Sequence, residues 1–325
     1  MTPQEKRHLT LVLGMHRSGT SVLARALPVL GISLGERLLP AHPCNPKGFF
    51  EDADINAGNR VLLKELGASW ESPVSFRDMQ GRLRGLATSE YGQAALALVR
   101  ERGEAADRQA AEEGAALPAP LAFKEPRMSR LLTFWRPIFL AAGCSLHVCL
   151  ALRHPAHVAA SLTSRNGFPA AQSWRLWLYH TLDALEGSTG LPLFVVDYDT
   201  LLCAPEAQLR RLARHLGRPV REDALRVFRD SFLDASLRHH AAAPAVRAEE
   251  GGASPAGAPT AGEMPGEAEI LLAEDMYATL RAAAHDKYDM AAPALARRLL
   301  RWRNALEALP PAPCMAAVSD VGGGR

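Results

Sequence analysis

Short apolar runs alternate with amphipathic segments along most of this chain. Helical spacing of apolar positions predicts helices over 81–114, 172–186, 205–216, 268–284 and 293–309. The apolar runs expected to form buried strands are 9–13, 121–124, 145–152 and 193–198. Strands that alternate with helices are typical of an α/β fold with a mostly parallel sheet, so we expect three layers, α/β/α.

The pattern also divides the chain. Residues 1–240 carry the strands and are expected to form one catalytic domain. Residues 241–267 are rich in Ala, Gly, Pro and Glu, which is typical of a flexible linker or loop. The helices of 268–309 are expected to pack on the domain, and 310–325 to form a disordered tail.

The first strand is followed by a loop of the phosphate-binding kind. Gly14 and Gly19 have the separation of the frame G-x-x-x-x-G-K-[ST], and Ser21 has the place of its hydroxyl residue. Thr20 stands where nucleotide triphosphatases have Lys, and the cation is Arg17, inside the loop. This change argues against hydrolysis of ATP or GTP and favours another phosphorylated ligand.

A second polar site follows the strand 145–152. Arg153 comes at its carboxyl end, Pro155 can start a helix, and Ser161 lies two turns further on. An arginine and a hydroxyl in these places can bind a second phosphate. By themselves the two residues are better explained by a salt bridge of Arg153 at a sheet edge and by a serine that packs or caps a helix.

Together the two sites resemble the sulfotransferase family, whose donor is 3′-phosphoadenosine 5′-phosphosulfate (PAPS) and whose nucleotide product is 3′,5′-adenosine bisphosphate (PAP). The family's loop (K/R)-S-G-T-(S/T) matches residues 17–21, and its Arg and Ser eight positions apart match Arg153 and Ser161. The resemblance covers about 9–240 and implies a fold like that of the P-loop nucleotide triphosphatases. It implies donor contacts from Gly14, His16, Arg17, Ser18, Gly19, Thr20, Ser21, Arg153, Ser161 and Arg238.

Other segments fit the same resemblance. Residues 45–52 look like the acceptor-side segment of bacterial members, and 123–127 look like the family's K-D-P segment with Glu125 in place of Asp. The R-K-G loop of the animal enzymes is not evident, so Arg238 or Arg165 is expected to close the 3′-phosphate pocket.

The resemblance also suggests catalytic side chains. Arg17 and Lys124 are expected to stabilise charge on the leaving nucleotide, without a metal ion. Glu51 is the first candidate for the general base and Asp52 the second, although carboxylates here are equally expected at a helix start. His16 is the strongest rival base, ahead of His154 and His157.

Composition excludes some classes of protein. With 325 residues, a net charge of +2 and 48% hydrophobic residues, the chain lacks the overall basic charge of nucleic-acid-binding proteins. Five scattered cysteines, and the lack of a signal peptide or an apolar run of bilayer length, favour a cytoplasmic protein. The basic run 297–303 leaves a peripheral membrane contact open, although the solvated face of a packed helix is favoured.

Two other functions remain open at this stage. A P-loop kinase or nucleotide triphosphatase would need an acidic magnesium ligand, for which Asp197 is the fair candidate. A non-catalytic nucleotide-binding protein of the same fold is the third hypothesis. The acceptor, a hydroxyl of a carbohydrate, a lipid or a small molecule, cannot be chosen from the sequence, and the oligomeric state stays open.

Overall fold

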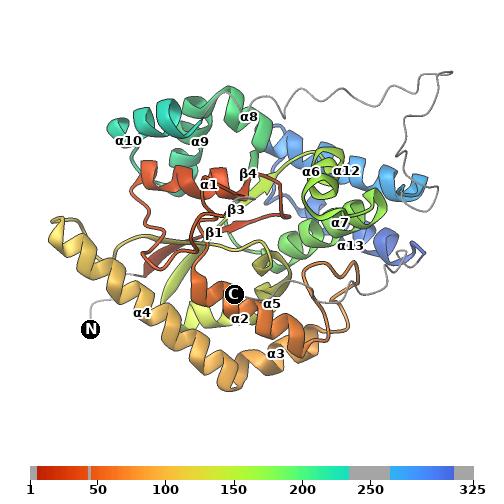
Figure 1. The fold of residues 1–325 in the computed structure, drawn as a ribbon, viewed down its shortest axis with the longest axis horizontal. Helices are drawn as coiled ribbons and strands as arrows, with labels where there is room; N and C mark the ends of the chain where they lie inside the picture. Colours follow the sequence, from red (N-terminus) through yellow and green to blue (C-terminus); the bar gives the residue numbers. More distant parts are fainter. Residues whose placement is uncertain (1–5, 43–44, 234–263, 311–325) are drawn as a thin grey trace.

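A parallel four-stranded sheet lies at the centre of the molecule (Figure 1). The computed structural model describes residues 6–42, 45–233 and 264–310. Within them the strand order is β2-β1-β3-β4, and each pair of neighbours is parallel. The strands are β1 (Arg7–Leu13), β2 (Leu121–Lys124), β3 (Cys144–Leu152) and β4 (Leu193–Asp197). All four lie within about two residues of the predicted runs.

Successive side chains of β1 enter different hydrophobic clusters. Leu9, Leu11 and Leu13 belong to the larger cluster, whereas Val12 belongs to the smaller one. Because side chains alternate along a strand, a sheet with apolar side chains on both of its faces must be covered on both. The three-layer α/β/α class predicted from the sequence is therefore confirmed.

Helices form a layer on each face of the sheet (Figure 1). The smaller cluster packs beneath α1 (Thr20–Ala26), η1 (Leu27–Leu30), α8 (Tyr198–Cys203), α9 (Pro205–Leu216), α10 (Glu222–Val227) and η2 (Phe228–Phe232). The larger cluster packs against α2 (Ala53–Glu65), α3 (Gln80–Thr88), α4 (Glu90–Glu112), α5 (Met128–Ala141), α6 (Pro155–Asn166) and α7 (Ala170–Gly187). Trp174 and Trp177, which lie on one side of α7, are part of this core.

The stretch 81–114 forms two helices rather than one. Ser89 is the boundary, because its hydroxyl accepts a hydrogen bond from the backbone N–H of Tyr91 and caps α4. A Cβ at Gly92 would lie 1.9 Å from the carbonyl oxygen of Ala87, so only glycine allows this close contact between the end of α3 and the start of α4. By contrast, α9 ends at Gly217 in the left-handed conformation, as the sequence predicts.

The C-terminal helices α12 (Glu267–Ala284) and α13 (Pro293–Glu307) extend the larger cluster. Met276 and Leu280 of α12 and Trp302 of α13 are fully buried in it. Residues 241–263 of the expected linker and 311–325 of the expected tail lie outside the described residues. Among the helices of the described ranges, none has the length and apolar character that crossing a bilayer requires.

The basic run of α13 is only partly solvated. Arg303 is 5% exposed, and its Nη2 lies 2.5 Å from Asp183 Oδ1 and 2.6 Å from Glu186 Oε2 of α7. This corrects the expectation of a solvated basic face for Arg303, which faces the core, whereas Arg297 and Arg301 are exposed as expected. The ion pairs fasten α13 to α7.

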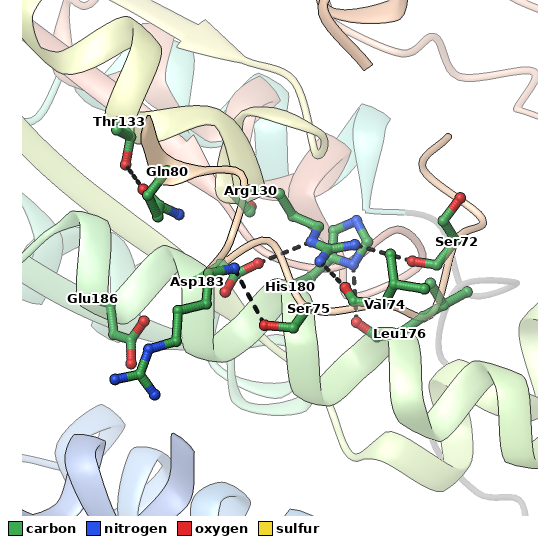
Figure 2. Close-up of polar contacts among 12 residues, drawn as sticks. Ser72, Val74, Ser75, Gln80, Arg130, Thr133, Leu176, His180, Asp183 and Glu186 are labelled. Carbon is green, nitrogen blue, oxygen red and sulfur yellow. Dashed lines mark hydrogen bonds and ion pairs between the residues drawn. The ribbon is translucent and has the colours of Figure 1, made fainter. Parts of the chain in front are cut away.

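A second buried arginine shares the carboxylate of Asp183 (Figure 2). Arg130 of α5 donates from Nε to Asp183 Oδ2 at 2.9 Å, and from its terminal nitrogens to the carbonyl oxygens of Ser72 and Val74. Its guanidinium carbon lies 3.6 Å from the ring centroid of Phe76. Asp183 therefore connects α5, α7, α13 and the segment that precedes α3.

Replacing Asp183 with Asn should destabilise the protein strongly. The change leaves Arg130 and Arg303 buried without their shared counter-charge, and breaking such a pair costs about 3–5 kcal/mol. Urea unfolding measures the effect. Asp230→Asn, which removes an exposed partner of Arg229, is the control and should leave the unfolding midpoint almost unchanged. Equal midpoints for the wild type and Asp183→Asn would contradict the assignment.

Candidate functional site

The loop between β1 and α1 has the backbone of an anion-binding turn. Arg17 and Gly19 both have left-handed backbone angles, with φ of 70° and 88°. Such residues turn neighbouring N–H groups toward one concave side. A Cβ at Gly19 would lie 2.2 Å from the ring of Tyr198, so only glycine fits. Ser129 of α5 supports the loop, because its hydroxyl accepts from the N–H of Gly14 at 2.9 Å.

The second polar site of the sequence lies against this loop. Arg153 donates from Nη1 to the carbonyl oxygen of Arg17 at 3.2 Å, and Arg17 donates from Nε to Ser161 Oγ at 2.8 Å. The Arg153 guanidinium also lies 4.6 Å from the ring centroid of Tyr198. Arg17 therefore contacts both Arg153 and Ser161, the other two residues that were predicted to bind the phosphates of PAPS.

Three buried polar atoms of the phosphate loop and of Arg153 have no hydrogen-bond partner among the described residues. They are Nε of Arg153, Oγ of Ser18 and Nε2 of His16. Unsatisfied buried donors are costly, and phosphate oxygens are acceptors that would satisfy them. The residues present therefore fit a phosphorylated ligand at this place.

The segment 45–52 brings a carboxylate to the same loop. Glu51 Oε1 lies 2.6 Å from Lys124 Nζ, and both side chains are buried. Lys124 also donates to the carbonyl oxygen of Phe49 at 3.0 Å and to Ser21 Oγ at 3.3 Å. Asn56 of α2 donates to the other oxygen of Glu51 at 2.7 Å. The expected base and the expected leaving-group cation are thus an ion pair beside the phosphate loop.

These groups line a cavity of about 380 Å³. It lies at the carboxyl ends of β1, β2 and β3, where ligands bind in open α/β sheets. Its polar and aromatic lining comprises His16, Arg17, Thr20, Ser21, Asn45, Phe49, Glu51, Asn56, Trp70, Lys124, Arg127, Arg153, Arg165 and Tyr198.

Asp52, the second candidate base, does not line this cavity. Its Oδ1 accepts hydrogen bonds from the N–H groups of Asp54 and Ile55 at 3.0 Å and so caps α2. Its Oδ2 lies 2.7 Å from Nε of the buried Arg102. The expectation of a catalytic Asp52 is therefore corrected, and the helix-start interpretation applies to it.

The histidines are poorly placed as bases. His16 lines the cavity, but burial, together with Arg127 and other nearby cations, holds its pKa well below the ordinary value. Its ring packs on Trp70 with 4.2 Å between centroids. His154 caps α6 through Nδ1, and neither it nor His157 lines the cavity. Glu51 remains the candidate base.

The structure adds residues that the motifs did not indicate. Trp70 lies between α2 and α3, and Ser129 is in α5; neither has a motif that would have identified it. Tyr198 follows β4 within the segment 196–202, which resembles the family's Y-E-D-L strand end, yet no role was assigned to it. Arg127 was within the K-E-P-R segment, yet no role was assigned to it. Arg165, expected to close the donor pocket, lines the cavity, whereas Arg238 lies outside the described residues.

Glu125, beside the catalytic candidates, is fully buried. It accepts a hydrogen bond from Asn59 Nδ2 at 2.6 Å and forms an ion pair with Arg127. Burial raises the pKa of the Glu125 carboxyl to about 7, although Arg127 and Asn59 favour its charged form. Near neutral pH this carboxyl therefore neutralises Arg127 only in part.

No protein-family profile matches the sequence, and no curated protein matches it. Among solved structures, the sulfotransferase domain of the Synechococcus PCC 7002 olefin synthase aligns with a TM-score of 0.44 and 18% identity over 86% of this chain and 98% of that one. The sulfotransferase domain of the curacin biosynthetic pathway aligns with a TM-score of 0.39 and 16% identity over 68% of this chain and 77% of that one.

Sulfotransferase STF1 of Mycobacterium tuberculosis H37Rv aligns with a TM-score of 0.37 and 15% identity over 70% of this chain and 72% of that one. These structures are sulfotransferases, the family that the sequence resembles. At such identities and TM-scores the activity has to be argued from the side chains of the site.

The raised pKa of Glu125 predicts a pH-dependent stability. Between pH 4.5 and about 7 the unfolded chain has released this proton while the folded chain holds it, so the folded state loses stability as pH rises through this window. Glu125→Gln lacks this proton and should gain stability relative to the wild type over the same window. Urea unfolding of both proteins from pH 4 to 8 measures the difference. A constant difference across the series would refute the assignment.

Proposed function

We propose that this protein is a sulfotransferase that moves a sulfuryl group from PAPS to an acceptor hydroxyl. One observation carries the proposal: the phosphate loop and the Arg153–Ser161 site meet through Arg17. A ligand held there has two anionic groups at neighbouring places, which suits a nucleotide with a 5′-phosphosulfate and a 3′-phosphate. The unsatisfied donors of Arg153 and Ser18 support this assignment.

The charges of the cavity suit the transfer. The acceptor oxygen attacks sulfur, the bond between sulfur and the bridging oxygen breaks, and the nucleotide leaves as PAP with the electron pair. Arg17, Lys124 and the loop N–H groups face the negative charge that develops on the leaving oxygens. Glu51 takes the acceptor proton, so the products are a sulfate ester, PAP and the protonated carboxyl.

The ion pair of Glu51 with Lys124 positions the carboxylate before the acceptor enters the cavity. In the absence of acceptor, Lys124 holds the carboxylate beside Ser21 of the loop. An acceptor hydroxyl that enters can donate to the same carboxylate, and the Lys124 ammonium remains beside the oxygen that becomes negative. Positioning and electrostatics then supply most of the rate increase, as in phosphoryl transfer.

The phosphotransferase hypothesis finds less support. Asp197, its candidate magnesium ligand, accepts from the N–H of Thr200 at 2.8 Å and from its hydroxyl at 2.7 Å, and so caps α8. It does not line the cavity. The loop position that would carry the triphosphate lysine is Thr20, which is buried.

Binding of PAP tests the donor. Arg17→Ala and Arg153→Ala should each weaken its affinity about 10- to 100-fold, since a hydrogen bond to a charged group is worth about 1.5–3 kcal/mol. Isothermal titration calorimetry measures the change, and Arg60→Ala on the exposed side of α2 is the control. Unchanged affinity in both variants with retained melting temperatures would sink the proposal.

Glu51→Gln tests the general base separately from the donor. Loss of a general base lowers turnover about 10²- to 10⁴-fold, whereas the affinity for PAP should change little because the contacts among Arg17, Arg153 and Ser161 are unchanged. Transfer of ³⁵S from labelled PAPS to an acceptor that the wild-type protein sulfates measures turnover. Full activity in Glu51→Gln would show that another group takes the proton.

A further inference from the structure

Phe50, the residue before the candidate base, has a strained backbone. Its φ of 56° lies in the left-handed region, where a phenylalanine is rarely found. Phe49 and Glu51 line the cavity, whereas Phe50 between them does not. The strained angle therefore occurs where the chain directs Glu51 into the cavity and Phe50 to another side. Strain of this kind persists only where the surrounding contacts hold it.

The ring of Phe50 packs against η2. Its centroid lies 6.0 Å from that of Phe232, in an edge-to-face arrangement, and the Phe232 ring stacks on that of Phe228 at 5.6 Å. Phe228 is fully buried in the smaller hydrophobic cluster. The three phenylalanines thus connect the residue before Glu51 to the core on that face of the sheet.

Phe232 makes a second connection to the same segment. Lys47 Nζ donates to the carbonyl oxygen of Phe232 at 2.6 Å and lies 5.3 Å from its ring centroid. The guanidinium of Arg25, in α1, lies 5.7 Å from the same centroid. The ring of Phe232 therefore contacts the helix that follows the phosphate loop and two residues of the segment 45–52.

The cavity-side contacts of Glu51 change during the proposed reaction. Lys124 and Asn56 bind its two carboxylate oxygens at 2.6 Å and 2.7 Å, and an acceptor hydroxyl that donates to the carboxylate competes with them. Phe232 does not line the cavity. Its contacts with the segment 45–52 therefore remain in place while the partners of the carboxylate are exchanged.

We propose that Phe232 is a positioning residue of the transfer reaction: it holds Phe50 and Lys47, and so keeps the Glu51 carboxylate where an acceptor hydroxyl meets the donor. The inference rests on the proposed function and adds to it a residue that touches neither substrate. Loss of the ring lets Phe50 relax its strained angle, which moves the carboxylate relative to the phosphate loop. A displacement of about 1 Å is enough to lower a rate about 10²-fold.

Hydrogen exchange, followed by NMR, tests the structural part without turnover. In Phe232→Ala the amide of Leu39, which donates to the Glu51 carbonyl oxygen at 2.8 Å, should exchange about 10-fold faster than in the wild type. The amide of Val148 in β3 should keep its rate, which excludes general destabilisation. Val227→Ala is the matched control, because its side chain in α10 is 52% exposed. An unchanged rate at Leu39 would overturn the inference.

Steady-state kinetics test the positioning role. With PAPS and an acceptor that the wild type sulfates, Phe232→Ala should lower kcat about 10- to 100-fold, while KM for PAPS and the affinity for PAP stay unchanged. Phe232→Tyr keeps the ring and should restore most of the turnover. Val227→Ala should behave like the wild type.

A double variant distinguishes positioning of Glu51 from general damage. If Phe232 acts through Glu51, Phe232→Ala should lower turnover no further in the Glu51→Gln background. Additive losses, or an unchanged kcat in Phe232→Ala, would overturn the inference. Weaker PAP binding in Phe232→Ala would also overturn it, by assigning the ring to the donor. If the wild type bound no PAP, the proposed function would fail, and hydrogen exchange would still decide whether Phe232 holds the segment.

Discussion

The pairing of β1 with a parallel strand on each side is the constraint on which the whole site depends. Val12 is in register with Lys124 of β2 and Leu13 with Leu150 of β3, so all three strands end at one edge of the sheet. A parallel sheet with both faces buried tolerates no slip of one residue, because a slip would exchange the two hydrophobic clusters. The packing of the core therefore fixes the distance between the phosphate loop, Lys124 and Arg153.

Buried ion pairs hold the outer elements to this edge. The ion pair between Lys124 and Glu51 holds the segment 45–52 against the phosphate loop. The ion pair between Arg102 and Asp52 holds the residue that caps α2, so the helix starts at Ala53. Asp183 of α7 forms ion pairs with Arg130 and Arg303. Arg130 in turn donates hydrogen bonds to the carbonyl oxygens of Ser72 and Val74 (Figure 2), which follow Trp70 closely in the sequence. Breaking one of these pairs leaves a buried charge, so each also specifies where its loop can lie.

The sequence predicts the parts of this protein that depend on local pattern. The four strands and the end of α9 at Gly217 follow from periodicity and from the glycine itself. The positions of Glu51, Lys124 and Arg153 near one loop follow from the resemblance of their segments to those of sulfotransferases. The sequence could not separate Glu51 from Asp52, since adjacent residues point in different directions and only tertiary partners decide their use. The contacts of Trp70 and Arg303 could not be predicted for the same reason, because their neighbours lie on elements far apart in the chain.

The missing lysine of the phosphate loop has a structural counterpart. Thr20 is buried, with its methyl group against Gly14, and the nearest ammonium to Ser21 comes from Lys124 on β2. A lysine in the loop would follow the phosphates of a flexible triphosphate chain, whereas Lys124 is fixed by Glu51 and the Phe49 carbonyl. A fixed cation next to a carboxylate suits a reaction in which charge develops at one oxygen while a proton leaves nearby. With Thr20 in the loop, the ammonium group beside Ser21 comes from β2 instead of from the loop itself. This different anchoring of the cation suits a different chemistry on the same fold.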